Sequence, residues 1–400
     1  MLALGLAACG AQPSSNADIA EIIIWTQTSG PDAEAQQATF KAYNAANPQY
    51  KVKMISMKKE TFNAKLATAA RSSKDVPDIA VVASEEVPTW QAQGILVPWG
   101  ESLHGTKVTA DAYVPAAWKV GEIAGERYGI PGTMPTWISY YNKKLIDKYV
   151  PGALDDGIIT FDEIDTAAPK AKADGVYVYA NAWPFQNYDN LYLQMGGKWQ
   201  NDQGNISVAN NISTAVFKKL QQLNRGGYMV PHGKDADKEF LNGKLMVIPQ
   251  GTWMLNTFKK AKFEWGESLV PQWDINNLVQ ASGTDQYVVI KSAQERPAEK
   301  LKSMANLMEW LQSNQLEMLK SGANPSAVAM LENEEYSRMP QSFLLKDPKM
   351  FNAISIITTP GLSYVNTEID ARSWDMIDGK ADIAKTLKTI QKTVEQKLQQ

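Results

Sequence analysis

Strand and helix patterns alternate over residues 21–83, and this order constrains the fold more than any other feature of the chain. The run "EIIIW" is continuously apolar and β-branched, as in a strand buried on both faces of a sheet, and "GPDAEAQQATFKAYNAANP" follows it as a helix. The segments "YKVKMISM", "ETFNAKLATAARSS" and "VPDIAVVAS" continue as strand, helix and strand. This β-α-β-α-β order predicts a parallel, doubly wound sheet flanked by helices.

The ends of these strands predict where a ligand would bind. In doubly wound sheets, ligands bind outside the carboxyl ends of the strands. Trp25 and Thr26 follow the first strand, and Glu85 and Glu86 follow the third. Because successive side chains of a strand point to opposite faces, only one of the two glutamates is expected to reach a ligand.

Aromatic residues are the strongest positive signal in the composition. The chain has 12 tryptophans and 15 tyrosines, and several stand beside Gly, Pro, Thr or Asn rather than in periodic apolar runs. Such side chains combine a flat apolar face with a polar handle, which suits the C–H faces and hydroxyl rims of sugars. Trp310 is an exception, because it lies in an apolar helical repeat and is expected in the core.

Composition excludes several other classes of function. The net charge is −3, with 40 basic and 43 acidic residues intermixed, so no nucleic-acid partner is expected. A single cysteine rules out a disulfide framework, and two isolated histidines give no metal-ligand spacing. We find no phosphate loop, nucleophile elbow or zinc-protease motif, and we therefore expect no metal, no cofactor and no catalysis.

Cys9 lies in "LAACG", between a short apolar run and the polar stretch "GAQPSSNA". This arrangement resembles the lipobox of bacterial lipoproteins, in which the cysteine is diacylated on sulfur. We therefore expect residues 1–8 to be a signal-peptide remnant and residues 9–17 a lipidated tether that holds the protein at the bacterial cell membrane, outside the cytoplasm. The alternative is an unmodified thiol in a disordered tail.

Seven segments in order resemble one family. They are "VPDIAVV", "WQAQGILVPW", "YGIPGTMPTWISYYNKKL", "FLNGKLMVIPQGTWML", "GTDQYVVIKSAQ", "KSGANPS" and "WDMIDGKADIAKTLKTIQKTVEQKL". Together they resemble the extracellular solute-binding proteins of bacterial ABC transporters, in the maltose-binding-protein-like family that binds carbohydrates.

The resemblance implies an α/β, two-lobed periplasmic-binding-protein-like fold. Each lobe would be a mostly parallel sheet flanked by helices, with the ligand cleft between the lobes. The N-terminal lobe would comprise residues 18–125 and 285–324, and the C-terminal lobe residues 126–284 and 325–400. The protein would be a monomer that binds a carbohydrate, expected to be an oligosaccharide, by lobe closure and delivers it to the membrane subunits of an ABC permease.

The resemblance also implies the residues that contact the ligand. They are Trp25, Thr26, Glu60, Glu85, Glu86, Trp137, Trp183, Trp253 and Asp285. Trp253 follows an apolar strand and "PQG", where the family often places an aromatic ring that stacks on sugar. A place in the core is the alternative for Trp253, and packing is equally compatible with Trp183.

Two other functions remain open at the level of sequence. An exported glycoside hydrolase would use the same aromatic residues and add two carboxylates about 5 to 9 Å apart. A binding protein for a non-sugar solute such as a peptide is the second alternative. Only the order of the family segments argues against the hydrolase.

Lipid anchoring through Cys9 predicts a simple change of location. Cys9→Ser removes the sulfur that would be acylated, so the variant should move from the membrane to the medium or the soluble fraction. Immunoblots of fractionated cells measure this shift. Membrane retention equal to that of the wild type would contradict the anchor.

Overall fold

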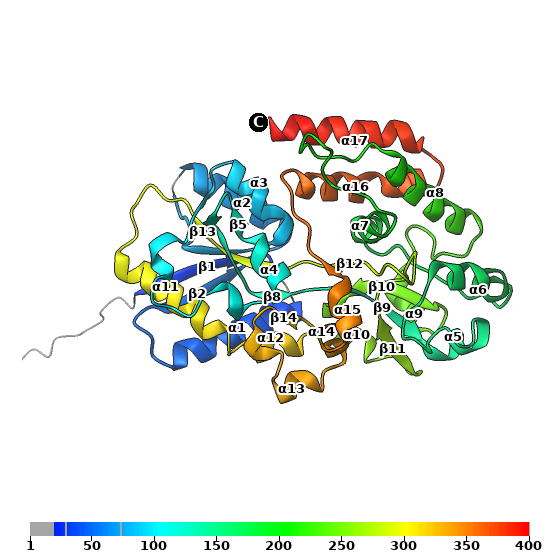
Figure 1. The fold of residues 1–400 in the computed structure, drawn as a ribbon, viewed down its shortest axis with the longest axis horizontal. Helices are drawn as coiled ribbons and strands as arrows, with labels where there is room; N and C mark the ends of the chain where they lie inside the picture. The colour runs from blue at the N-terminus through cyan, green and yellow to red at the C-terminus, as the bar shows by residue number, and fades with distance from the viewer. Residues whose placement is uncertain (1–19, 29, 73, 400) are drawn as a thin grey trace, which may run out of the picture.

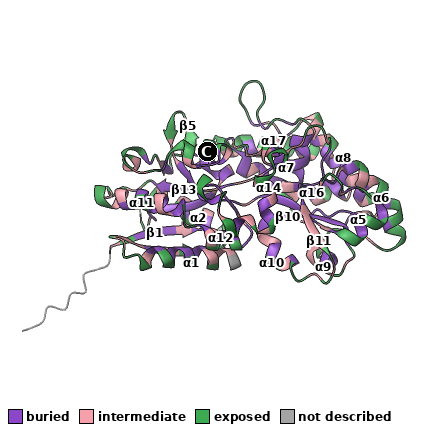
Figure 2. Cartoon of the chain, turned by 60° about the horizontal axis from the view of Figure 1, so that its bottom comes forward, coloured by how far each residue is buried: buried purple, intermediate pink, exposed green. Residues whose placement is uncertain are grey.

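The computed structural model describes residues 20–28, 30–72 and 74–399. The described chain forms two lobes that lie side by side (Figure 1). Buried residues gather along the strands and the inner faces of the helices in both lobes (Figure 2). Cys9 and the rest of the expected tether lie outside the described residues.

The first lobe is built on a sheet of six strands in the order β2-β1-β3-β13-β4, with β7 also paired to β13. The strands are β1 (Glu21–Thr26), β2 (Lys51–Ser56), β3 (Ile79–Ala83), β4 (Leu96–Val97), β7 (Gly129–Pro131) and β13 (Asp285–Ile290). The β-α-β-α-β order predicted for residues 21–83 is therefore confirmed, with β1 parallel to both β2 and β3.

Helices cover both faces of this sheet, because side chains alternate along each strand. On β3, Ile79 and Val81 pack with α1 and α11, whereas Ala80 and Val82 pack with α2 and α3. The helices of this lobe are α1 (Gly30–Ala45), α2 (Lys59–Ser72), α3 (Val87–Ala92), α4 (Pro115–Val120), α11 (Ala298–Leu311) and α12 (Leu316–Lys320).

The second lobe has a smaller sheet, in which β9 (Trp137–Asn142) lies between β10 (Val247–Gly251) and β11 (Trp265–Ser268). Parallel bridges from Tyr177 to Leu245 and from Tyr179 to Met229 extend it. Its helices are α5 (Lys143–Tyr149), α6 (Phe161–Ala173), α7 (Pro184–Gln194), α8 (Asn211–Arg225), α9 (Ala236–Leu241), α10 (Leu255–Phe258), α16 (Leu362–Ile377) and α17 (Ile383–Leu398).

Several short helices and strands lie outside the two main sheets. Between the two large sheets, β8 pairs with β14 and β12 pairs with β15 (Figure 1). The short elements are β5 (Glu122–Ile123), β6 (Glu126–Arg127), β8 (Thr133–Met134), β12 (Gln280–Ala281), β14 (Asn324–Pro325), α13 (Glu334–Ser337), α14 (Phe343–Lys346), α15 (Pro348–Ala353) and β15 (Ile354–Ser355).

One strand in each sheet runs against its neighbours, whereas β1 pairs in parallel with β2 and β3 and the bridges that extend the second sheet are parallel. β13 is antiparallel to β3, β4 and β7, and β9 is antiparallel to both β10 and β11. Both strands come directly after a segment that crosses between the lobes. Each pairs first with the carboxyl end of its neighbour, Asp285 with Ala83 and Trp137 with Gly251, and so must run in the opposite direction.

The buried cores extend further along the chain than the predicted lobe boundaries. Ala327, Met330 and Tyr336 are buried in the same cluster as Ile22 and Phe40 of the first lobe. The boundary predicted at residue 324 therefore falls inside that core.

The C-terminal helix forms where its apolar spacing predicts it. Asp382 caps α17 by accepting a hydrogen bond from the Lys385 N–H, and Leu387, Ile390 and Val394 are buried. The helix lies along α16 and α8 on the outside of the second lobe (Figure 1). Within the part of the chain that the structure describes, no helix is both long and apolar enough to cross a bilayer.

One buried carboxylate ties the first lobe together. Asp78, 5% exposed, accepts hydrogen bonds from the Ile23 N–H at 2.9 Å and from Arg296 Nε at 3.0 Å. Its second ion pair is with Lys300 Nζ at 2.7 Å. A single side chain thus joins β1, the start of β3 and the N-terminal part of α11.

Removing this carboxylate should destabilise the protein. Asp78→Ala leaves the Ile23 amide and two cations without their acceptor, so the free energy of unfolding in urea should fall by about 3 kcal/mol. The control is Glu334→Ala, which breaks an exposed ion pair with Arg338 and should cost less than about 1 kcal/mol. Equal losses in the two variants would contradict the assigned role of Asp78.

Candidate functional site

A cleft lies between the lobes, at the carboxyl ends of the strands. It has two connected parts, which share Pro135, Trp253 and Asp285. The first part is also lined by Thr28, Asp32, Gln36, Thr133, Thr252, Tyr287, Met318, Ser321 and Ala323. The second is also lined by Ala83, Ser84, Glu85, Trp137, Phe185, Gln186, Asp189, Asn190, Ala281, Ser282, Gly283, Thr284, Ile357 and Leu362.

The crossing segments form the floor of this cleft and bind one another. The Gly132 N–H donates to the Asp285 carbonyl at 2.7 Å, and the Gly283 N–H donates to the Pro135 carbonyl at 3.2 Å. The hydroxyls of Thr136 and Ser282 lie 3.0 Å apart. The residues just before β9 and β13 are therefore held together, and with them the side chains at the starts of both strands.

Trp253 is fixed by the short turn that follows β10. The Thr252 N–H donates to the Thr136 carbonyl at 3.0 Å, and the Tyr140 hydroxyl donates to the Thr252 carbonyl at 3.2 Å. The indole ring lies over Gly251, where any Cβ would overlap it. Gly251 therefore allows the ring to stay close to its own backbone, and the half-buried Trp253 lines both parts of the cleft.

Two more tryptophans pack against Trp253. The ring centroids of Trp137 and Trp253 are 4.6 Å apart, and those of Trp183 lie 5.6 Å from Trp137 and 6.2 Å from Trp253. Trp137 is 4% exposed, and its indole N–H is buried without a hydrogen-bond partner among the described residues. Trp183 is 40% exposed and donates its N–H to Gln250 at 2.8 Å.

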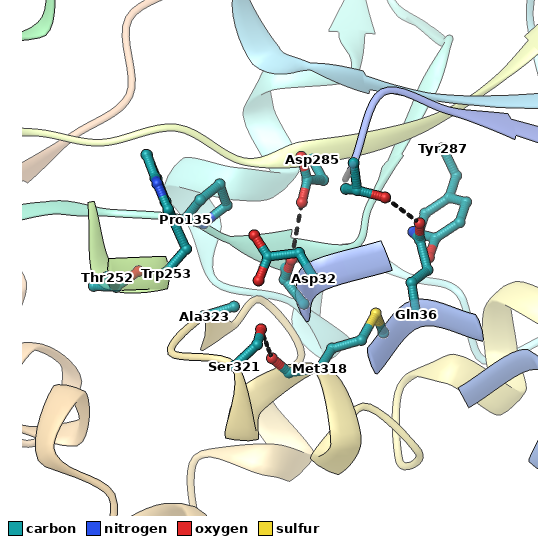
Figure 3. A pocket seen from close by; sticks show the side chains of 12 residues that line it. Asp32, Gln36, Pro135, Thr252, Trp253, Asp285, Tyr287, Met318, Ser321 and Ala323 are labelled. Atoms are coloured by element: carbon teal, nitrogen blue, oxygen red, sulfur yellow. Dashed lines mark hydrogen bonds between the residues drawn. The ribbon is translucent and has the colours of Figure 1, made fainter. Parts of the chain in front are cut away.

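Asp285 stands at the centre of the cleft, where β13 begins. Its Oδ2 accepts a hydrogen bond from the Thr133 hydroxyl at 3.0 Å. Burial raises the pKa of Asp285 to about 7, and the nearby carboxylates Asp32 and Glu85 add to the increase. Figure 3 shows Asp32 and Asp285 on the same side of the first part of the cleft, between Trp253 and Gln36.

Three further carboxyl groups line the cleft. Burial raises the pKa of Asp32, which hydrogen-bonds to Ser321. Burial raises the pKa of Asp189 on α7 to about 7, although Asp189 accepts a hydrogen bond from the Trp199 N–H at 2.8 Å. Glu85 forms an ion pair with Lys59 at 3.8 Å.

Four of the nine predicted contacts do not line the cleft, and the side chain of a fifth, Glu60, lies outside what the structure describes. Trp25 packs against the core cluster under α2 and α3, because its side chain alternates with the buried Thr26. Thr26 hydrogen-bonds to Thr28, which does line the cleft. Glu86 is buried beside Asn63, and burial raises its pKa to about 7.

The other two positions are Trp183 and Glu60. Trp183 lines a neighbouring surface pocket with Asn181, Asp237 and Trp374 rather than the cleft itself. Glu60 lies in the first turn of α2, and its side chain is outside what the structure describes. Glu85, Trp137, Trp253 and Asp285 are the predicted residues that line the cleft.

Asp32 and Asp189 are cleft residues that the sequence analysis missed. Asp32 stands in the first turn of α1, shortly after β1. Because ligands bind at the carboxyl edge of such a sheet, this position predicts a cleft residue. Asp189 lies on α7 of the second lobe, and nothing local to its sequence places it beside Glu85.

The chemistry of the lining is that of a binding site. Aromatic faces, amides and carboxylates surround the cleft, and residues 20–28, 30–72 and 74–399 contain no group of three His, Cys, Asp or Glu side chains placed to hold a metal ion. The mixture of one flat apolar plate and several hydrogen-bond acceptors matches sites that orient a small polar ligand.

Ionisation of Asp285 should make stability depend on pH. Its folded pKa is about 7 against an ordinary value of 3.8, so the folded state binds more protons between these pH values and its unfolding free energy falls as the pH rises. Asp285→Asn removes this contribution. At pH 8 the variant should be more stable than the wild type by about 1–2 kcal/mol, with no difference near pH 4.

Chemical denaturation of both proteins from pH 4 to pH 8 measures this difference. Glu295→Gln is the control, because Glu295 is exposed and lies outside the cleft. Equal free energies of unfolding for the variant and the wild type at every pH would contradict the raised pKa of Asp285.

Sequence comparisons identify relatives along most of the chain. A family described as bacterial extracellular solute-binding protein matches residues 25–318. The maltotriose-binding protein of Pyrococcus abyssi is 23% identical over 63% of this chain and 53% of its own length. The galactooligosaccharide-binding protein of Bacillus subtilis is 22% identical over 95% of this chain and 91% of its own. The chain thus spans about half of the first relative and nearly all of the second.

Solved structures share the fold. The GacH receptor of Streptomyces glaucescens, known unliganded and with acarbose, matches with a TM-score of 0.77 and 17% identity, over 95% of this chain and 98% of its own. The galacto-N-biose-/lacto-N-biose I-binding protein of Bifidobacterium longum matches with a TM-score of 0.76 and 19% identity, over 95% and 97%. Because the family match covers well over half of the sequence, the chain belongs to the bacterial extracellular solute-binding proteins.

Proposed function

We propose that this protein is the substrate-binding component of an ABC importer, and that it binds an oligosaccharide by closure of its two lobes. The proposal rests mainly on the half-buried ring of Trp253, which lines the cleft together with Asp285 and with residues of both lobes. Sugar rings stack on such a plate through their C–H faces, while carboxylates and amides accept hydrogen bonds from hydroxyls. Relatives named for maltotriose, galactooligosaccharides and arabinooligosaccharides support this ligand class.

Closure is supported by contacts that already join the lobes beside the cleft. The Gln93 amide donates to the Tyr364 hydroxyl at 2.7 Å, and the Gly361 N–H donates to the Thr89 hydroxyl at 3.2 Å. These bonds connect α3 of the first lobe with the start of α16. Movement of the lobes about the crossing segments would make and break them as a ligand binds and leaves.

Delivery to a permease and anchoring by a lipid on Cys9 are the finer parts of the proposal. The family description places such proteins outside the cytoplasm, where a tether would keep the receptor near its transporter. The transport step itself would draw its energy from other chains of the importer. We propose no catalysis for this chain.

A glycoside hydrolase is the alternative that the cleft carboxylates keep open. Asp32, Glu85 and Asp285 provide enough acidic groups for such a reaction. Against it, the matching family consists of solute-binding proteins. Chromatography of a bound oligosaccharide after long incubation distinguishes the two, since a hydrolase releases shortened sugar and a receptor returns the ligand intact.

Replacement of Trp253 tests directly whether its ring binds the sugar. Trp253→Ala removes the plate, and truncation of such an anchor costs about 2 to 4 kcal/mol of binding free energy, or roughly 30- to 700-fold in affinity. Titration calorimetry with a panel of oligosaccharides and tripeptides measures affinity, and the melting temperature of the ligand-free protein reports folding.

Trp90→Ala is the matched control, because Trp90 is 6% exposed and packs on Phe62 in the core of the first lobe. This variant should lose about 3 to 5 kcal/mol of stability and keep its affinity at temperatures where it is folded. If Trp253→Ala instead melts like the control and binds sugar normally, Trp253 is a core residue. Binding of no saccharide in the panel would reject the proposed function.

A further inference from the structure

Among the described residues, the charged side chains that line the cleft are all acidic. Asp32 and Asp285 line its first part, and Glu85, Asp189 and Asp285 line its second. Among the described residues no lysine or arginine lines either part. Lys59, which does not line the cleft, forms an ion pair with Glu85 at 3.8 Å.

The acidic side chains come from different elements and act on one another. Asp32 stands on α1, Glu85 directly after β3, Asp189 on α7 and Asp285 at the start of β13. The charges of Asp32 and Glu85 both raise the pKa of Asp285, and the charge of Glu85 raises that of Asp189. Carboxylates from both lobes therefore share one electrostatic environment.

The hydrogen bonds that Asp32, Asp189 and Asp285 form within the protein do not cancel their negative charges. Asp285 has the Thr133 hydroxyl as a partner, Asp189 has the Trp199 N–H, and Asp32 has Ser321. These are neutral donors, which solvate a carboxylate without cancelling its charge. Closing the lobes removes water from the same carboxylates, and like charges in a desolvated site repel strongly.

Something must offset this repulsion when the cleft closes, either a proton taken up by the protein or a positive charge on the ligand. A neutral sugar leaves the first route only. A protonated amine instead allows the carboxylates to stay ionised and forms charge-assisted hydrogen bonds with them. The face of Trp253, on the wall of the same part of the cleft, adds a favourable surface for a cation.

From this arrangement we infer that the ligand is a saccharide that carries a protonated amino group, with its nitrogen held between Asp32 and Asp285 beside Trp253. The inference rests on the proposed function and specifies the class of sugar. Figure 3 shows both carboxyl groups reaching into the first part of the cleft, with Trp253 across from Asp32. Trp137, whose buried N–H has no hydrogen-bond partner among the described residues, lines the second part.

Sugars that differ at one carbon provide the test. Titration calorimetry of the full chain at low salt compares glucose with glucosamine and N-acetylglucosamine, galactose with galactosamine, and the β-1,4-linked dimers and trimers of the glucose series. The amino member of at least one set should bind ten or more times as tightly as its hydroxyl and N-acetyl partners. Its advantage should shrink with added salt, and also when the pH is raised until the amine loses its proton.

Charge-neutral variants show whether the carboxylates cause the preference. Asp32→Asn and Asp285→Asn each keep the size of the side chain and remove its charge, so each should reduce the amino-to-hydroxyl affinity ratio at least fivefold. Glu101→Gln, which removes an exposed charge outside the cleft, should leave the ratio unchanged. Melting temperatures confirm that all three variants are folded.

Three outcomes overturn the inference. Neutral sugars that bind as tightly as their amino partners would reject the cationic ligand and leave the proposed function intact. A preference that survives both asparagine variants would place the nitrogen elsewhere. Ethanolamine binding as tightly as the amino sugars would reject the saccharide part, and failure of every saccharide to bind would reject the proposed function as well.

Discussion

The structure depends on where two strands begin. β9 and β13 each follow a segment that crosses from one lobe to the other, and each joins its sheet at the carboxyl ends of the neighbouring strands. A strand that starts at this edge must run against the others. Its first residue must also lie at the cleft, which is why Trp137 and Asp285 line it. The hydrogen bonds between the crossing segments then hold the starts of β9 and β13 close together.

This geometry also explains why aromatic and acidic groups meet in one place. The turn after β10 carries Trp253 and is bonded to Thr136 in the crossing segment, while α1 brings Asp32 to the same edge from the first lobe. Trp253 and Asp32 thus come from different lobes and line the same part of the cleft. The cost is a set of carboxyl groups whose pKa values are raised by burial and mutual repulsion. Hydroxyl groups of a ligand can donate hydrogen bonds to these carboxyl groups, but among ligands only one with a positive charge offsets their negative charge.

Sequence patterns were sufficient for the fold class and for part of the cleft lining. The alternation of strands and helices in residues 21–83 led to the first sheet, and the apolar spacing of Leu387, Ile390 and Val394 led to α17. The resemblance to a family led to Trp253 and Asp285, which local patterns alone leave undecided between cleft and core. The reversed direction of β9 was not predicted, because pairing within a sheet is a long-range property that no local period encodes.

Two predicted contacts, Trp25 and Glu86, do not line the cleft, and each has a local structural reason. Trp25 was assigned to the cleft by its position at the end of β1, yet side chains alternate along a strand, and Trp25 faces the core under α2 and α3. Glu86 falls in the tight turn after β3, which buries it beside Asn63 while Glu85 reaches the cleft. Asp189 and Glu85 line the same part of the cleft although they come from different lobes. This proximity depends on tertiary structure, which no local sequence pattern encodes.

Closure of the two lobes about the crossing segments, without turnover, is the central claim. Solution X-ray scattering of the purified protein, with and without a saturating saccharide, tests it most directly. Lobe closure without turnover predicts a smaller radius of gyration in the liganded protein and a saccharide that is recovered intact. An unchanged radius of gyration at saturation would contradict it, because the ligand would then occupy a site that the lobes do not close upon.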